Sequence, residues 1–248
     1  MENKVAVVTA AGQGIGKACA LELHARGYNL VLFSRSGAAE ALAGELGGIG
    51  LSGSVTEAED LEKLFDLAVT TYGHVDCWIN NTGHAPNTGV FPRSSAYDPK
   101  LELNLLSLTD GDWLTAMDMI FLNVVRATRL IAPLMAEQGG GAIVNITSFG
   151  QKEPSYGFPT GSCMRMALAG YTKLFADSFA GQNVRMNNVL PGFIENFEYT
   201  DDMLSHVPIG RPGTLVELAK TVAFLLSDDA GFITGQSVLV DGGMNRGV

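Results

Sequence analysis

Apolar residues gather in seven short runs, separated by segments with helical spacing. The runs cover residues 5–8, 30–33, 49–51, 76–80, 142–146, 184–190 and 237–240. Most are continuously apolar rather than alternating, which is typical of parallel strands covered on both faces. Between the third and fourth runs, Leu61, Leu64, Phe65, Ala68 and Tyr72 recur at spacings of three and four, which predicts a helix with one buried stripe. This alternation predicts an α/β fold, a doubly wound parallel sheet of about seven strands with helices on both faces.

Polar residues mark two helix starts and one long connection. Thr56 with Glu59, and Thr214 with Glu217, have the spacing of a capping box and predict that a helix begins at each. Residues 84–109 contain three prolines and predict a loop inserted into a single domain that spans residues 1–248. Leucines in the second half of this loop predict that it packs on something, either as a short edge element or against substrate or a partner subunit.

Composition narrows the classes of function. The chain is 46% apolar, but no run looks long enough to span a bilayer, and the N-terminus lacks a secretory signal. A cytoplasmic protein is predicted. The net charge of −10 disfavours nucleic acid and anionic membranes as partners. Cys19, Cys77 and Cys163 lie in apolar segments without metal-binding spacing, so buried reduced thiols are expected and no metal site is predicted.

A glycine cluster stands between the first strand and the next helix. Gly12, Gly14 and Gly16 would let the backbone turn sharply beside a pyrophosphate, which the N–H groups at the helix start would bind. The dinucleotide fingerprint G-x-G-x-x-G does not fit, because counting from Gly12 its last glycine falls on Lys17. A tight strand-to-helix turn without a ligand is the alternative. The flanking strand and helix favour a nucleotide site.

The second strand ends in Ser34, Arg35 and Ser36 rather than in an acidic residue. A carboxylate there would bind the adenosine 2′-hydroxyl, whereas a guanidinium and hydroxyls suit a 2′-phosphate. The segment therefore favours NADP(H) over NAD(H). A solvated surface arginine is the alternative.

Several segments, taken in order, resemble the short-chain dehydrogenase/reductase family along the whole chain. They are TAAGQGIG at 9–16, DCWINNTG at 76–83, MIFLNVV at 119–125, AIVNITS at 142–148, NNVLPGFIEN at 187–196 and FLLSDDAGFITGQSVLVDGG at 224–243. The resemblance implies a Rossmann-like sheet, a nicotinamide cofactor, hydride transfer between the cofactor and an alcohol or carbonyl, and a homotetramer. It implies catalytic positions at Asn123 and Ser148. The implied cofactor-binding residues are Thr9, Gly12, Gln13, Gly14, Ile15, Gly16, Ser34, Arg35, Ser54, Val55, Asn81, Thr82, Gly83, Arg165, Pro191, Gly192, Ile194 and Asn196.

The chain departs from the family at the catalytic pair Y-x-x-x-K, where Gly161 and Arg165 stand. Glycine has no proton to give, whereas Arg165 can hold the nicotinamide ribose but cannot readily relay a proton. Tyr156 is the best candidate for a displaced acid, although it could instead pack on the substrate loop. Ser162 and His84 are weaker candidates. At Ser54 the family usually has an aspartate that meets the adenine, and serine would replace it more weakly.

Three hypotheses follow. The first is an NADP(H)-dependent oxidoreductase, of carbonyl reductase or alcohol dehydrogenase type, with a rearranged active site in which Ser148, Asn123, Tyr156 and Arg165 act on a small carbonyl or alcohol. The second is a cofactor-binding homologue with a non-redox or sensing function. The third is a non-catalytic partner subunit. Four acids in residues 195–207 favour a neutral or cationic substrate over a phosphorylated or CoA-linked one.

Overall fold

The computed structural model describes residues 3–82, 105–154 and 156–247. Seven parallel strands form one sheet in the order β3-β2-β1-β4-β5-β6-β7. Their bounds are β1 Val5–Thr9, β2 Asn29–Ser34, β3 Ile49–Ser52, β4 Cys77–Asn80, β5 Gly141–Ile146, β6 Val184–Pro191 and β7 Ser237–Val240. The order reverses beside β1, where β4 pairs on its other side. The predicted Rossmann-like doubly wound sheet is therefore confirmed.

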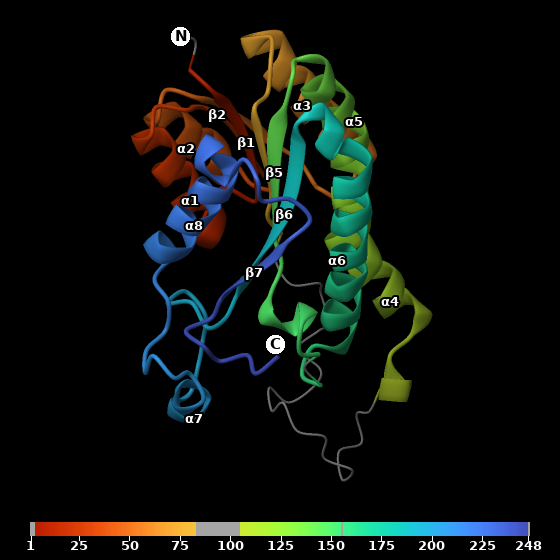
Figure 1. Cartoon of the computed structure of the whole chain (residues 1–248), viewed down its shortest axis with the longest axis vertical. Helices are drawn as coiled ribbons and strands as arrows, with labels where there is room; N and C mark the ends of the chain where they lie inside the picture. The colour runs from red at the N-terminus through yellow and green to blue at the C-terminus, as the bar shows by residue number, and fades with distance from the viewer. Residues whose placement is uncertain (1–2, 83–104, 155, 248) are drawn as a thin grey trace.

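Helices cover both faces of this sheet (Figure 1). They are α1 Gly14–Ala25, α2 Ala38–Glu45, α3 Ala58–Tyr72, α4 Asp110–Ala116, α5 Asn123–Glu137, α6 Pro159–Phe179, α7 Asp201–Ser205 and α8 Leu215–Leu226. One apolar core joins the sheet to α1, α2 and α8, and a second joins it to α3, α5 and α6. Successive residues of a strand point into different cores: Val8 packs in the first core and Val7 in the second. This explains why the strands are apolar throughout.

The two predicted helix starts have different outcomes. Thr214 accepts a hydrogen bond from the Glu217 N–H at 3.1 Å, and the Glu217 carboxylate accepts from the Thr214 N–H at 2.8 Å, so that capping box is confirmed. The prediction for Thr56 is wrong. Helix α3 begins at Ala58, and the Thr56 hydroxyl instead lies 2.8 Å from the Ser54 hydroxyl in the preceding turn.

The segment before α4 lies only partly within the described residues. Residues 83–104, most of the predicted inserted loop, are outside them. Leu105 and Leu106, in a 3-10 turn at Leu105–Ser107, expose 48% and 92% of their surface, so the described chain does not bury them and their packing on a substrate or a partner subunit stays a prediction. Thr109 caps α4 in a capping box with Asp112.

By length and composition, one stretch among the described residues could cross a membrane, contrary to the expectation from sequence. It is Asp110–Glu137, which joins α4, a π-helical turn at Met117–Leu122, and α5. Half of its apolar window is buried inside the protein, and Ala127, Ile131 and Met135 belong to the second core. A core helix meets the same criterion, so the stretch is weak evidence for a membrane span.

Candidate active site

The predicted site residues gather at the carboxyl edge of the sheet. Thr9 ends β1, Asn81 follows β4, Ser148 follows β5 and Pro191 ends β6. The carboxyl ends of parallel strands meet at one edge, and ligands of such sheets bind where the strand order reverses. The sequence therefore brings these residues together through topology rather than through proximity along the chain.

The glycine turn leaves an open cradle at the start of α1. A Cβ on Gly16 would lie 2.2 Å from the Ala10 carbonyl oxygen, so only glycine fits where strand and helix approach. Gly14 has a φ of +53°, and a Cβ there would lie 2.8 Å from the Asn196 amide nitrogen. Gln13 stands at the N-cap position but its side chain makes no capping hydrogen bond, so the first N–H groups of α1 are available to an anion. These residues fit a pyrophosphate.

The end of β1 is fastened to the segment after β4. The Thr9 hydroxyl donates to the Asn81 carbonyl at 2.9 Å, and the Asn81 N–H donates to the Thr9 oxygen at 2.9 Å. The Asn81 amide also donates to the Ala10 carbonyl at 3.3 Å, beside Gly16. Thr82 follows half-buried, and Gly83 lies outside the described residues. The pairing fixes the floor beneath the glycine turn.

Arg35 and Ser34, at the end of β2, have different environments. The Ser34 hydroxyl donates to the Ser36 carbonyl at 2.6 Å and accepts from the Ala39 N–H at 3.2 Å, so it is engaged in opening α2. Arg35 is exposed, and within the described part of the chain it forms no ion pair. Its guanidinium is therefore the group at this edge that remains available to a phosphate.

The loop after β3 is held by Asp60. The carboxylate accepts from the Ser54 N–H at 3.0 Å, and this bond, with the Lys63 ammonium, lowers the pKa of Asp60. Val55 packs on the second core. The loop position is thus set by backbone contacts, with the Ser54 hydroxyl turned to Thr56.

The segment after β6 folds back toward the glycine turn. The Gly192 N–H donates to the Val240 carbonyl at 3.0 Å, and buried Ile194 forms a parallel bridge to Gly213. Asn196, two residues later, reaches the space beside Gly14. The two ends of the predicted cofactor site therefore meet.

Two hydroxyls converge at the end of β5. A Cβ on Gly150 would lie 3.0 Å from the Ser162 oxygen and 3.3 Å from the Ser148 oxygen. Ser148 is half-buried and precedes a 3-10 turn at Phe149–Gln151, whereas Ser162 lies buried in α6. Ser162, which the sequence ranks low as an acid, is thus close to the predicted catalytic serine.

Asn123 begins α5 directly after the π-helical turn. Its amide donates to the Met119 carbonyl at 2.6 Å, and its buried carbonyl oxygen finds no hydrogen-bond partner among the described residues. Such π-helical turns occur frequently at functional sites. The unpaired oxygen can accept a hydrogen bond from a water or a substrate.

Gly161 and Arg165 face each other on one side of α6. A Cβ on Gly161 would lie 2.8 Å from Arg165 Nη1, so the guanidinium occupies the space in which a side chain at 161 would begin. Arg165 is 6% exposed, and its Nε has no hydrogen-bond partner among the described residues. Burial lowers the pKa of Arg165 to about 10, which leaves it charged near neutral pH.

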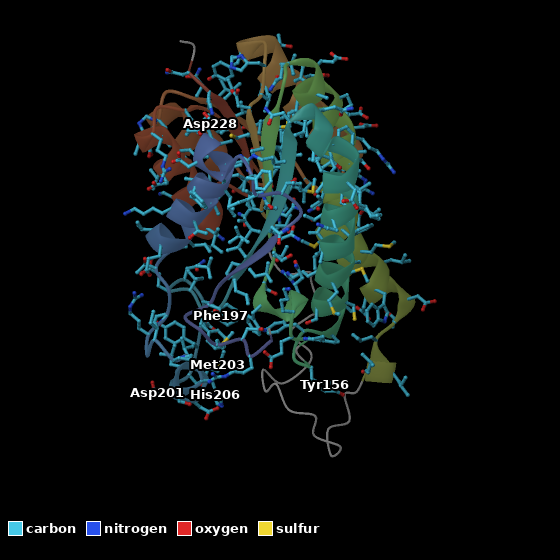
Figure 2. The ribbon with its side chains drawn as sticks, in the orientation of Figure 1. Tyr156, Phe197, Asp201, Met203, His206 and Asp228 are labelled. Carbon is cyan, nitrogen blue, oxygen red and sulfur yellow. The ribbon has the colours of Figure 1, made fainter. Side chains whose placement is uncertain are left out.

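Tyr156 lies half-buried before the start of α6, toward the same end of the molecule as Phe197 and Met203 of the segment after β6 (Figure 2). Cys163, expected to be buried, is exposed because it lies on α6 away from the side that carries Gly161 and Arg165. Cys19 and Cys77 are buried as expected, and burial raises the pKa of each to about 12. No group of three potential metal ligands is found in the described part of the chain.

The sequence analysis does not predict a row of buried, hydrogen-bonded asparagine side chains beneath the site. Asn80, Asn145 and Asn188 share one register position on adjacent strands, and their side chains are linked at 2.8 and 2.9 Å. Thr172 of α6 donates to Asn188 at 2.9 Å. The sequence signal for this ladder is an asparagine in each of three strands. It can be recognised only when the register between the strands is known. The ladder ties α6 to the sheet.

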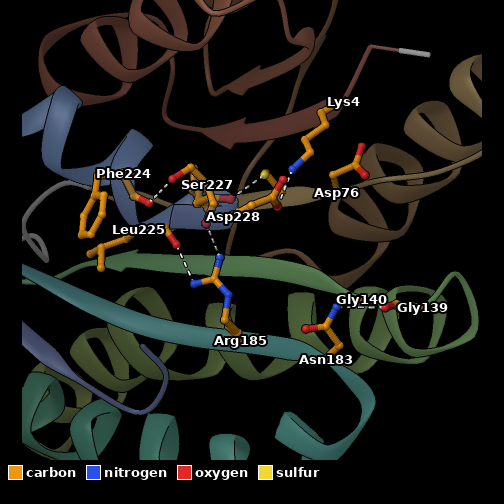
Figure 3. A network of polar contacts seen from close by, with 12 residues as sticks. Lys4, Asp76, Gly139, Gly140, Asn183, Arg185, Phe224, Leu225, Ser227 and Asp228 are labelled. Carbon is orange, nitrogen blue, oxygen red and sulfur yellow. Dashed lines mark hydrogen bonds and ion pairs between the residues drawn. The ribbon is translucent and has the colours of Figure 1, made fainter. Parts of the chain in front are cut away.

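A cavity of about 900 Å³ lies at the opposite, amino edge of the sheet. Its charged groups are already engaged (Figure 3): Lys4 pairs with Asp228 at 2.7 Å, and Arg185 donates to the carbonyls of Leu225 and Ser227. Because these contacts join β1 and β6 to the end of α8, we assign them a structural role rather than a place in the active site.

Comparison with known proteins identifies the lineage. The family described as enoyl-(acyl carrier protein) reductase matches residues 9–245. Similar proteins include a 3-oxoacyl-[acyl-carrier-protein] reductase of Synechocystis sp., 33% identical over 97% of this chain and 96% of its own. Another is dehydrogenase/reductase SDR family member 4 of Homo sapiens, 32% identical over 98% of this chain and 88% of its own. The FabG reductase of Thermotoga maritima is 29% identical over 98% of both chains. With this coverage and its seven-stranded parallel sheet, the chain belongs to the short-chain dehydrogenase/reductase family of oxidoreductases.

Proposed function

We propose that this protein is an NADP(H)-dependent oxidoreductase, of carbonyl reductase or alcohol dehydrogenase type, with a rearranged active site. The observation that carries the proposal is the meeting of Asn196 with the glycine turn at Gly14, at the edge where Ser148 follows β5. Such an arrangement provides a cradle for a dinucleotide and a polar group beside it. The similarity to proteins named as reductases supports the redox class.

The first N–H groups of α1 would hold the pyrophosphate, and exposed Arg35 would bind a 2′-phosphate. Ser54 and Val55 would border the adenine, and Asn81 with Thr82 would support it. Pro191, Gly192, Ile194 and Asn196 would enclose the nicotinamide end. The bound nicotinamide supplies or accepts the hydride. Ser148 would donate a hydrogen bond to the substrate oxygen and so orient the reacting carbonyl.

Proton transfer needs a group other than residue 161. Arg165 remains charged near neutral pH and would contribute positive charge and donors to the ribose, but it would not act as the acid. We assign the proton to Tyr156 or to a water held near Ser148 and Asn123, whose buried carbonyl oxygen is available as an acceptor. General acids of this kind contribute about 10²–10⁴-fold to the rate.

A second candidate function is cofactor binding without ordinary hydride transfer, in a non-redox enzyme, a nucleotide sensor or a partner subunit. The glycine at position 161 favours it, because that position cannot supply a proton. For either function we propose a cytoplasmic homotetramer. Exposed apolar side chains on α6, Met166 at 46% and Leu174 at 66%, support association between subunits.

The experiment compares NADPH oxidation by the wild type and by Tyr156→Phe over a panel of small carbonyl compounds. If Tyr156 is the acid, we expect kcat to fall at least 100-fold with NADPH binding unchanged. An unchanged kcat would assign the proton to water. Tight NADPH binding with no NADPH oxidation in the presence of any carbonyl compound would reject the oxidoreductase proposal and favour the second candidate.

A further inference from the structure

Arg165 is a buried cation that has no ion-pair partner among the described residues. It is 6% exposed, its Nε has no hydrogen-bond partner among the described residues, and no described ion pair includes it. Burying a guanidinium without a counter-charge is strongly unfavourable, so proteins retain such groups where a ligand or partner supplies the charge. The side chain therefore needs an anion that the described chain does not provide.

The position of the guanidinium indicates where that anion would lie. Nη1 stands 2.8 Å from the point at which a Cβ on Gly161 would begin, in the first turn of α6. The same point lies 3.9 Å from the Ile120 Cδ1 atom and 4.0 Å from the Phe158 Cβ atom. Apolar neighbours strengthen an electrostatic contact by excluding water. The guanidinium thus lies beside the position at which the family has its tyrosine.

Arginine at position 165, where the family has lysine, changes the shape of the cationic group. A lysine at 165 would offer a compact ammonium on a flexible stem, whereas an arginine presents a fork of donors that matches the two oxygens of a carboxylate. The ribose in the proposed function would occupy some of these five donors, but its hydroxyls carry no charge. The absence of a Cβ at 161 is what makes room for the fork.

The acidic segment after β6 does not argue against an anionic ligand. Glu195 accepts from the Leu215 N–H at 2.8 Å, at the start of α8. Asp201 and Asp202 lie in the first turn of α7, where a negative charge is favoured by the helix dipole. Three of the four acids in this segment therefore act at helix N-termini, which weakens the argument for a cationic substrate.

We propose that Arg165 binds a carboxylate of the substrate beside Gly161, so that the site takes oxo or hydroxy acids rather than their neutral analogues. The proposal rests on the proposed function in placing the substrate beside the cofactor. It differs from that function in naming the charge of the substrate and the group that recognises it.

The test measures binding rather than turnover. Acetoacetate and methyl acetoacetate, and pyruvate and methyl pyruvate, are titrated calorimetrically into the full chain with saturating NADP⁺. In at least one pair we expect the acid to bind at least tenfold more tightly than its ester. Arg165→Met should abolish the preference, and Arg165→Lys should retain part of it. Lys173→Met, which removes an exposed cation from the same helix, should leave it unchanged.

Two further measurements keep the outcome decisive. Thermal unfolding of Arg165→Met should show no loss of stability, because methionine is of similar length and removes an unpaired buried charge. NADP⁺ binding is measured separately, because a failure of the proposed function would appear as an absence of cofactor binding. In that case the acids and their esters are titrated into the protein without cofactor. The proposal would be overturned if neither acid bound tenfold more tightly than its ester. It would also be overturned if Arg165→Met preferred the acid over the ester as strongly as the wild type does.

Discussion

The contact between Gly161 and Arg165 can be tested through stability alone. Helix α6 contains a second glycine, Gly170, whose added Cβ would meet nothing within 4 Å. Alanine is favoured over glycine inside a helix by about 0.8–1 kcal/mol. Gly170→Ala should therefore raise the free energy of unfolding by about 1 kcal/mol, which corresponds to about 2–4 °C in Tm for a domain of this size.

Gly161→Ala should behave differently although it lies in the same helix. Its Cβ would approach Arg165 Nη1 to 2.8 Å, so the buried guanidinium must move. Forcing a group into a packed interior costs about 1–3 kcal/mol. Set against a propensity gain of at most about 1 kcal/mol, the expected result lies between no change and a loss of about 2 kcal/mol.

Thermal or urea unfolding of five proteins measures this coupling: the wild type, Gly170→Ala, Gly161→Ala, Arg165→Met and the double variant Gly161→Ala/Arg165→Met. In the Arg165→Met background, the alanine at 161 should recover most of its propensity gain, and the two substitutions should be non-additive. Equal stabilisation by Gly161→Ala and Gly170→Ala in the wild type would refute the placement of the guanidinium over Gly161.

Three further predictions concern the cofactor turn and the fold. Arg35→Ala should weaken NADPH binding about 10–100-fold, as loss of a charge-assisted hydrogen bond does, and leave NADH binding unchanged in fluorescence titrations; equal losses for both would refute the 2′-phosphate role. Ala10 has a φ of +47°, so Ala10→Gly should raise the unfolding free energy by up to about 1 kcal/mol, and a lower Tm would contradict this. The Arg211 side chain, followed by Thr214, lowers the pKa of Glu217 to about 2 from an ordinary 4.5. The stability from this contact is present above pH 4.5 and is lost as the pH falls toward 2, so the Tm difference between the wild type and Glu217→Gln should shrink over that range.

The sheet could be predicted from sequence because each strand is buried on both faces. Continuous apolar runs at 5–8, 142–146 and 184–190 leave no polar face, and only a parallel sheet covered by helices accommodates such strands. The Thr214 capping box can also be predicted from the sequence, because its two partners lie three residues apart. Information of this kind is local or periodic, and sequence reasoning recovers it.

The exceptions depend on specific contacts, some local and some between segments that are far apart in sequence. Thr56 has the spacing of a cap, but Ser54 binds both its hydroxyl and the Asp60 carboxylate, and this turn places the helix start at Ala58. The side of α6 on which Cys163 falls depends on how that helix lies against the sheet. The approach of Asn196 to Gly14 depends on the fold of the segment after β6. None of these has a periodic signature.

Gly161 and Arg165 are best understood as one change rather than two. Taken separately, each change removes part of the family's catalytic pair. Gly161 stands in place of a proton donor, and Arg165 replaces a lysine with a bulkier cation. In the structure the two positions are in contact, since Nη1 lies 2.8 Å from the point at which a Cβ at 161 would begin. A tyrosine restored at 161 alone would meet the guanidinium. Because that reversal is disfavoured while Arg165 is present, the site keeps a buried cation beside the position where the family places a proton donor. A site of this kind stabilises negative charge on the substrate more readily than it supplies a proton, and the proton must then come from Tyr156 or from water.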